Sequence, residues 1–262
     1  MRRRFFVDHF DGASAVLRGD AAHHLGRVLR AQPGQLYELS DGQSVWLART
    51  ERVRRGVVEF VLVEPVAARE PTLRTTLLIS IVKFDRLEWG LEKATELGVA
   101  EIVPLAAART EKALVAAASK RSGRWQKILL ESAQQSRRLR PPVLREIARP
   151  RDAFRQAQGK VKVLLSERPD APALRASVEE IRGRNFGSEV AGASSGASAR
   201  EGPETRGFSA VLAIGPEGGW TDEEILEARE AGFAEASLGV NILRTETAVV
   251  AALATLNFAL GE

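Results

Sequence analysis

The sequence predicts an α/β protein in which a small, β-rich N-terminal domain precedes a larger domain with a mostly parallel sheet. Short apolar segments broken by turns fill the first seventy residues. Prolines at positions 65 and 71 then bracket a charged link, and beyond it continuous apolar runs alternate with helical patterns. Because continuous apolar runs are typical of parallel strands covered on both faces, we expect two domains, residues 1–70 and 71–262.

The N-terminal domain is expected to be a small barrel. Its predicted strands are residues 5–7, 15–17, 36–39, 45–48 and 57–63. Asp41-Gly42 separates two of these strands and is a strong hairpin-turn signal. Between the second and third strands, residues 23–30 predict a short helix that carries arginines.

The larger domain is expected to place helices between parallel strands. Its predicted strands are residues 76–82, 101–105, 161–166, 210–214 and 236–239. Helices are predicted from two capping-box patterns, Asp85 with Glu88 and Thr221 with Glu224. Further helices are expected around Trp125 and over residues 245–259, the latter apolar nearly all round and therefore buried or at a subunit interface. Residues 183–207, rich in Gly, Ser and Ala, are expected to form a flexible insertion.

Composition limits the possible functions. The 262 residues include no cysteine and only three histidines, at positions 9, 23 and 24, so we expect neither a disulfide nor a metal site. No signal peptide or membrane span is evident, which favours the cytoplasm. The net charge of +4 suits a polyanion-binding protein, although the bias toward arginine, 31 of 38 basic residues, would also follow from a GC-rich genome.

A glycine-rich loop is the most specific local pattern. Residues 214–220 read Ile-Gly-Pro-Glu-Gly-Gly-Trp and lie between a predicted strand and a capped helix. Ligands bind at such carboxyl-end loops in open α/β sheets, and glycines allow close approach of the backbone. A simple tight turn is the structural alternative. The loop matches neither a P-loop nor a dinucleotide-binding fingerprint.

Three other patterns carry charged groups. Residues 238–248 run from a strand end into a helix, with Arg244 just before Thr245, a predicted N-cap. Lys83, Lys93, Glu96 and Arg109 form a second group, of which Lys93 and Glu96 would equally suit an exposed helix pair. Residues 131–142 end a helix with amides and arginines that could meet phosphates.

Taken in order, these patterns resemble the ribosomal RNA small-subunit methyltransferase E family of the SPOUT, or trefoil-knot, superfamily. The resemblance covers nearly the whole chain. It rests on residues 4–7, 24–30, 93–98, 134–136, 214–219 and 242–248. The sequence departs from the family pattern at Asn241, where arginine is more usual, and at Arg137-Arg138, where glycine commonly precedes the arginine.

The resemblance implies a PUA-like RNA-binding barrel, a knotted α/β domain and a homodimer. It also implies that S-adenosyl-L-methionine binds among three loops. The corresponding residues are Leu165, Ser166, Glu167, Ile214, Gly215, Pro216, Glu217, Gly218, Gly219, Leu238, Gly239, Ile242, Leu243, Arg244 and Thr245.

The implied reaction is methylation of N3 of a uridine in 16S ribosomal RNA of the small subunit, which requires an unpaired or flipped base and loss of the N3 proton. Arg109 or Arg244 would stabilise negative charge on the uracil oxygens, and Glu217 or water would accept the proton. The candidates for phosphate contacts are Arg4, Arg27, Arg30, Arg137 and Arg138. Two alternatives remain at this stage: a non-catalytic ribosome-assembly protein, and a related methyltransferase for transfer RNA or a ribose 2′-hydroxyl.

Overall fold

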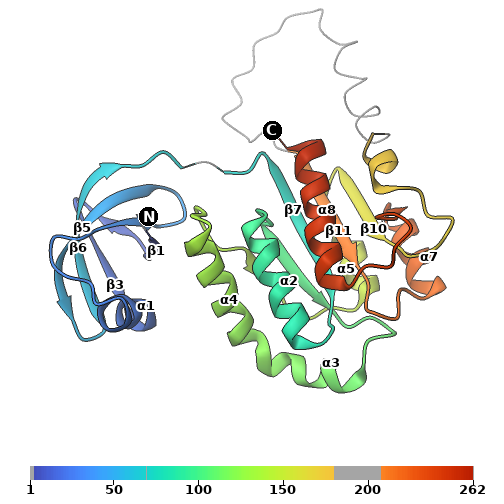
Figure 1. The fold of residues 1–262 in the computed structure, drawn as a ribbon, viewed down its shortest axis with the longest axis horizontal. Coiled ribbons are helices and arrows are strands. Elements are labelled where there is room, and N and C mark those ends of the chain that lie inside the picture. Colours follow the sequence, from blue (N-terminus) through green and yellow to red (C-terminus); the bar gives the residue numbers. More distant parts are fainter. Residues whose placement is uncertain (1–2, 69, 180–207, 262) are drawn as a thin grey trace, which may run out of the picture. The chain divides into compact units, whose positions relative to one another are not determined.

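The fold was obtained as a computed structural model that describes residues 3–68, 70–179 and 208–261 (Figure 1). The chain divides into two compact units. The first unit combines residues 1–70 with residues 130–141, and the second combines residues 71–129 with residues 142–262. The first unit therefore includes a later segment of the chain, the end of helix α4 (Ser122–Gln135) and the residues after it. The expected insertion at residues 183–207 lies outside the described residues.

The first unit contains a curled, mixed sheet of six strands. In spatial order these are β1 (Arg4–Phe6), β4 (Leu36–Ser40), β5 (Val45–Arg54), β6 (Val57–Pro65), β3 (Ser14–Arg18) and β2 (Phe10–Asp11). The pairs are antiparallel except β1 with β4. No pairing joins the edge strands β1 and β2 within the described residues, so the expected closed barrel is replaced there by a half-barrel. The short β2 was missed because two residues give no alternation to detect.

The turns and helices of this unit follow local chemistry. Asp41 accepts hydrogen bonds from the backbone of Gln43 and Ser44, and Gly42 has φ 84°, which confirms the predicted hairpin turn. The predicted helix is present but irregular. An α-helical turn, α1 (Gly19–His23), continues directly into a π-helical turn, η1 (His24–Val28).

A buried ion pair joins β1 to β4. The Arg4 guanidinium donates to the Glu38 carboxylate at 2.9 and 3.2 Å and also to the backbone oxygen of Arg137. The side chains of Arg4 and Glu38 are only 7% and 9% exposed. Arg4 is thus committed to internal partners, and the expectation that it contacts RNA phosphate does not suit this geometry.

The segment after α4 is held in the first unit by its backbone. Ser40 donates through Oγ to the carbonyl of Leu139 at 2.6 Å. Arg137 has φ 55°, in the left-handed region that disfavours residues with a Cβ. This backbone conformation gives a physical reason for glycine at the position where the sequence departs from the family pattern. Next to it, burial and repulsion from Arg140 lower the pKa of Arg138 to about 10.

The second unit contains a six-stranded sheet that is parallel throughout. Its strands, in spatial order, are β12 (Ala234–Ala236), β10 (Val161–Leu165), β11 (Phe208–Ile214), β7 (Leu73–Ser80), β8 (Glu101–Leu105) and β9 (Val143–Leu144). The predicted parallel sheet is confirmed, with β9 as a short additional edge strand.

Helices cover both faces of this sheet (Figure 1). Helices α2 (Phe84–Glu96) and α8 (Thr245–Leu260) pack together on one face, where the core cluster also includes Trp125 of α4. Helices α5 (Pro150–Gln156) and α7 (Asp222–Glu230) cover the other. Strand β11 accordingly alternates, with Leu212 in the first cluster and Val211 in the second. None of the helices in the described ranges is long and apolar enough to cross a membrane.

The predicted helix caps have mixed outcomes. The Thr221–Glu224 capping box is confirmed in both directions. The Asp85–Glu88 box is wrong, because the N-cap is Lys83 and Glu88 instead pairs with Arg121 and Arg124. Thr245 is likewise not the N-cap of α8. That position belongs to Arg244, and Thr245 Oγ1 lies 3.5 Å from the carbonyl oxygen of Gly215, to which it donates.

Replacing Arg4→Ala should lower the free energy of unfolding by about 3 kcal/mol, because Glu38 would remain buried without its cationic partner. Urea denaturation would measure the loss, with the exposed Arg27→Ala as a control expected to leave the midpoint unchanged. Unaltered stability of Arg4→Ala together with weakened RNA binding would restore the phosphate-contact role.

Candidate active site

A cleft of about 660 Å³ opens at the carboxyl ends of three neighbouring strands in the second unit. Strands β10, β11 and β12 end at Leu165, Ile214 and Ala236. Leu165 is paired with Ile214 on one side and with Ala236 on the other, so the three strands end at the same level. The loops that follow these strands line most of the cleft, and Arg86 and Arg109 complete it. Its volume is within the ordinary range for small-molecule sites.

The glycine-rich loop after β11 is packed closely against its neighbours. Trp220 is buried and donates through Nε1 to the carbonyl of Leu165 at 2.9 Å, which joins this loop to the end of β10. A Cβ at Gly215 would lie only 3.1 Å from the Trp220 indole. Gly219 has φ 68°, a conformation that glycine adopts without strain. Glycine is therefore favoured at position 215 by the close approach of the indole and at position 219 by the backbone conformation.

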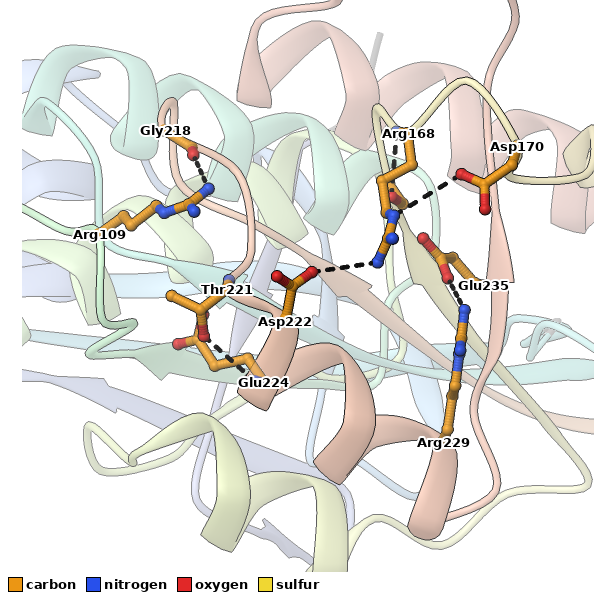
Figure 2. A network of polar contacts seen from close by, with 10 residues as sticks. Arg109, Arg168, Asp170, Gly218, Thr221, Asp222, Glu224, Arg229 and Glu235 are labelled. Atoms are coloured by element: carbon orange, nitrogen blue, oxygen red, sulfur yellow. Dashed lines mark hydrogen bonds and ion pairs between the residues drawn. The ribbon is translucent and has the colours of Figure 1, made fainter.

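Arg109 supports this loop (Figure 2). Its Nη1 donates to the carbonyl of Gly218 at 2.9 Å, and a Cβ at Gly218 would lie 3.3 Å from the Arg109 Cβ. The arginine thus reaches the cleft as a positioning group for the loop backbone.

A buried carboxylate fixes the start of α7 to the loop that carries Arg109. Glu224, 6% exposed, accepts from the amide of Ala108 at 2.8 Å through Oε1 and from the amide of Thr221 at 2.9 Å through Oε2. One side chain therefore joins the loop after β8 to the loop after β11.

Arg86 is a cleft residue that sequence reasoning missed. It lies on the first turn of α2 and forms an ion pair with Glu217 of the glycine-rich loop. The two residues are 131 positions apart, so no local pattern links them. Only the adjacency of β7 and β11 in the sheet brings α2 next to this loop.

The opposite rim is formed by the loops after β10 and β12. Arg168 lies 3.3 Å from the Asp222 carboxylate and 3.7 Å from that of Asp170 (Figure 2). Burial raises the pKa of Glu167. Arg244 is exposed, lines the cleft, and has no side-chain partner within the described part of the chain.

Comparison with known proteins identifies the family. Residues 69–257 match the RNA methyltransferase domain family. A relative from Synechocystis, named ribosomal RNA small subunit methyltransferase E, is 33% identical over 249 residues, covering 94% of this chain and 73% of the relative. The protein of the same name from Bacillus subtilis is 30% identical, and the match covers 92% of this chain and 89% of that relative. This chain belongs to the ribosomal RNA small subunit methyltransferase E family.

A solved structure of a family member agrees with this assignment. The Neisseria gonorrhoeae ribosomal RNA small subunit methyltransferase E, described as bound to S-adenosyl methionine, superposes with a TM-score of 0.80. The two sequences are 29% identical, and the superposition covers 100% of this chain and 99% of the Neisseria gonorrhoeae chain. The α/β fold with a parallel sheet is thus the fold of this family.

The structure brings the sequence-predicted site residues of this family member together. All fifteen proposed cofactor residues line the cleft, as do Arg109, Glu217 and Arg244. Lys83, Lys93 and Glu96 do not line the cleft. Lys93 forms ion pairs with Glu92 and Glu96, each at 2.8 Å, in agreement with the alternative prediction that Lys93 and Glu96 form a helix pair. The five proposed RNA contacts lie in the first unit, where Arg27 and Arg30 are exposed and Arg137 is 3.8 Å from Glu38.

Replacing Glu224→Ala should destabilise the second unit by about 2 kcal/mol, because it removes a helix cap and leaves the amide of Ala108 unpaired. The neighbouring Glu223→Ala, an exposed change in the same helical turn, is the matched control and should shift the denaturation midpoint little. Equal effects of the two substitutions would show that the carboxylate bridge contributes nothing to stability.

Proposed function

We propose that this chain catalyses methylation of ribosomal RNA of the small subunit with S-adenosyl-L-methionine, at N3 of a uridine. The observation that carries the proposal is the cleft formed by the loops after β10, β11 and β12, because it gathers every predicted cofactor residue. Family membership supports the reaction class. A protein with a purely structural role in ribosome assembly would have no use for such a cleft.

The residues of the cleft fit S-adenosyl-L-methionine. Ile214, Leu238 and Leu243 supply apolar walls. Gly215 and Gly218 let the side chains of Trp220 and Arg109 pack closely against the loop backbone, which holds the loop in place beside the cleft. Backbone groups at three strand ends offer hydrogen bonds to a nucleoside. When bound, this cofactor supplies an electrophilic methyl group attached to a positively charged sulfur.

Transfer to N3 requires loss of the N3 proton, formation of the N3–methyl bond and cleavage of the methyl–sulfur bond. Negative charge develops on the uracil oxygens as the proton leaves, and a fixed cation there lowers the barrier. We assign this role to Arg244, because Arg109 and Arg86 are held by Gly218 and Glu217. Arg109 acts as a positioning residue.

Glu217 is the proposed contact for the base edge. Its carboxylate lies in the cleft and can accept a hydrogen bond from uridine N3–H, with the proton passing to the carboxylate or to water. The ion pair with Arg86 fixes the carboxylate in place. Retention of full activity by Glu217→Gln, with unaltered cofactor affinity, would exclude this role.

The remaining proposals concern the assembly. We infer a PUA-like first unit that meets RNA through Arg27 and Arg30, a knotted second unit, and a cytoplasmic homodimer. The homodimer is supported by α8, a mostly apolar helix on which the large apolar side chain of Phe258 is 93% exposed.

Incubation with labelled S-adenosyl-L-methionine and unmodified small ribosomal subunits should yield 3-methyluridine, identified by mass spectrometry after digestion of the RNA. A 2′-O-methylated nucleoside, or label in transfer RNA alone, would keep the reaction class and change the substrate. Tight RNA binding without any methyl transfer or cofactor binding would support the assembly-protein alternative.

Arg244→Met should lower kcat about a hundredfold, because it removes the cation at the developing charge. Its cofactor Kd, measured by calorimetry, should rise far less than kcat falls, and Arg244→Lys should recover part of the rate. Arg109→Met should behave differently, weakening cofactor binding because the glycine-rich loop loses its support. If both variants lost cofactor affinity equally, Arg244 would be a binding residue with no separate catalytic role.

A further inference from the structure

Five basic residues form a surface on the second unit that the cleft does not include. Lys112 lies on α3 (Lys112–Ala118), Lys120 and Arg121 lie on η2 (Ser119–Arg121), and Arg124 and Lys127 lie on the first turns of α4. We call these five residues the α3–α4 basic surface. Between positions 112 and 130 the sequence has no acidic residue.

The charge of this surface exceeds what composition explains. Its five positive charges are more than the +4 of the whole chain, so the remaining residues together are slightly acidic. Three of its members are lysines, although the chain has only seven. A bias toward arginine in the genome cannot account for a cluster of lysines.

The side chains around the basic residues are short. Ala113, Ala116, Ser119, Ser122 and Gly123 are all exposed, and a Cβ at Gly123 would meet nothing within 4 Å. None of the large exposed hydrophobic residues in the described ranges falls between 112 and 127. The three lysines are exposed among these small neighbours, and the surface lacks the apolar core that a protein interface needs.

The surface is connected to the cleft. Helix α3 starts three residues after Arg109, and Figure 1 places α3 beside the N-terminal ends of α2 and α4. Arg121 lies 4.7 Å from the ring centroid of Phe84, the first residue of α2, and α2 also carries Arg86 in the cleft. Glu88 accepts from Arg124 at 2.7 Å and lies 3.4 Å from Arg121, so one acid is shared by two arginines.

We propose that the α3–α4 basic surface binds the phosphate backbone of the RNA that flanks the target nucleotide. Lys112 and Lys120 are exposed and have no side-chain partner among the described residues, which suits them to phosphates as mobile point charges. Positive charge on one face is the electrostatic signature of a nucleic-acid interface. This inference rests on the proposed function and extends it. The second unit then binds RNA phosphates outside the cleft, in addition to any contact made by the first unit.

The test is the double variant Lys112→Gln/Lys120→Gln, which removes two exposed charges without breaking a described ion pair. Binding to a labelled small-subunit RNA fragment should weaken about tenfold at low salt, and the slope of log Kd against log salt should fall by about 1.5. Cofactor affinity, measured by calorimetry, should not change. Arg149→Gln/Arg155→Gln, the same charge change at two exposed arginines at the ends of α5, on the other face of the sheet, is the matched control and should bind RNA as the unaltered protein does.

The outcomes separate this inference from the proposed function. Unchanged RNA affinity and salt slope, with normal methyl transfer, would overturn the RNA surface and leave the function standing. Weakened binding to assembled subunits but not to naked RNA would show that the surface binds a ribosomal protein, and this result would also overturn the inference. Weakened RNA binding in a protein that transfers no methyl group would support the surface and contradict the function.

Discussion

The hydrogen bond from Trp220 to the carbonyl of Leu165 is the constraint on which the candidate site depends. It joins the glycine-rich loop to the end of the adjacent strand, and the indole lies so close to position 215 that glycine is favoured there. The parallel register of β10 and β11, with Leu165 opposite Ile214, places donor and acceptor at the same edge of the sheet. The cleft therefore follows from the sheet order and from one buried aromatic residue.

The cations of the cleft have different tasks. Arg86 holds Glu217, Arg109 holds the carbonyl of Gly218, and Arg168 approaches Asp222 across the opposite rim. Each of these arginines joins two segments that border the cleft, which reduces the freedom of the loops before a ligand arrives. Arg244 differs because it has no internal partner among the described residues, and a cation without a partner is available for charge that develops on a substrate.

The same distinction applies to the proposed RNA contacts. Arginine alone does not indicate a phosphate site, because Arg4 is buried against Glu38 and Arg138 is half-buried. Exposure and the local balance of charge are more informative. By these criteria Arg27 and Arg30 remain candidates in the first unit, and the α3–α4 basic surface joins them from the second.

The sequence by itself determined the α/β class, the parallel strands and the glycine-rich loop, because these depend on local periodicity and on glycines at a strand end. Its resemblance to a known family indicated the full set of three loops that line the cleft. The sequence also determined the Thr221–Glu224 cap, whose partners are three residues apart. Tertiary structure alone decided the ion pair of Arg86 with Glu217, the burial of Arg4, the true partners of Glu88 and the inclusion of residues 130–141 in the first unit. Each of these depends on the order of strands in a sheet or on contacts between residues far apart in the chain, and a local pattern contains no information about which distant side chain will meet it.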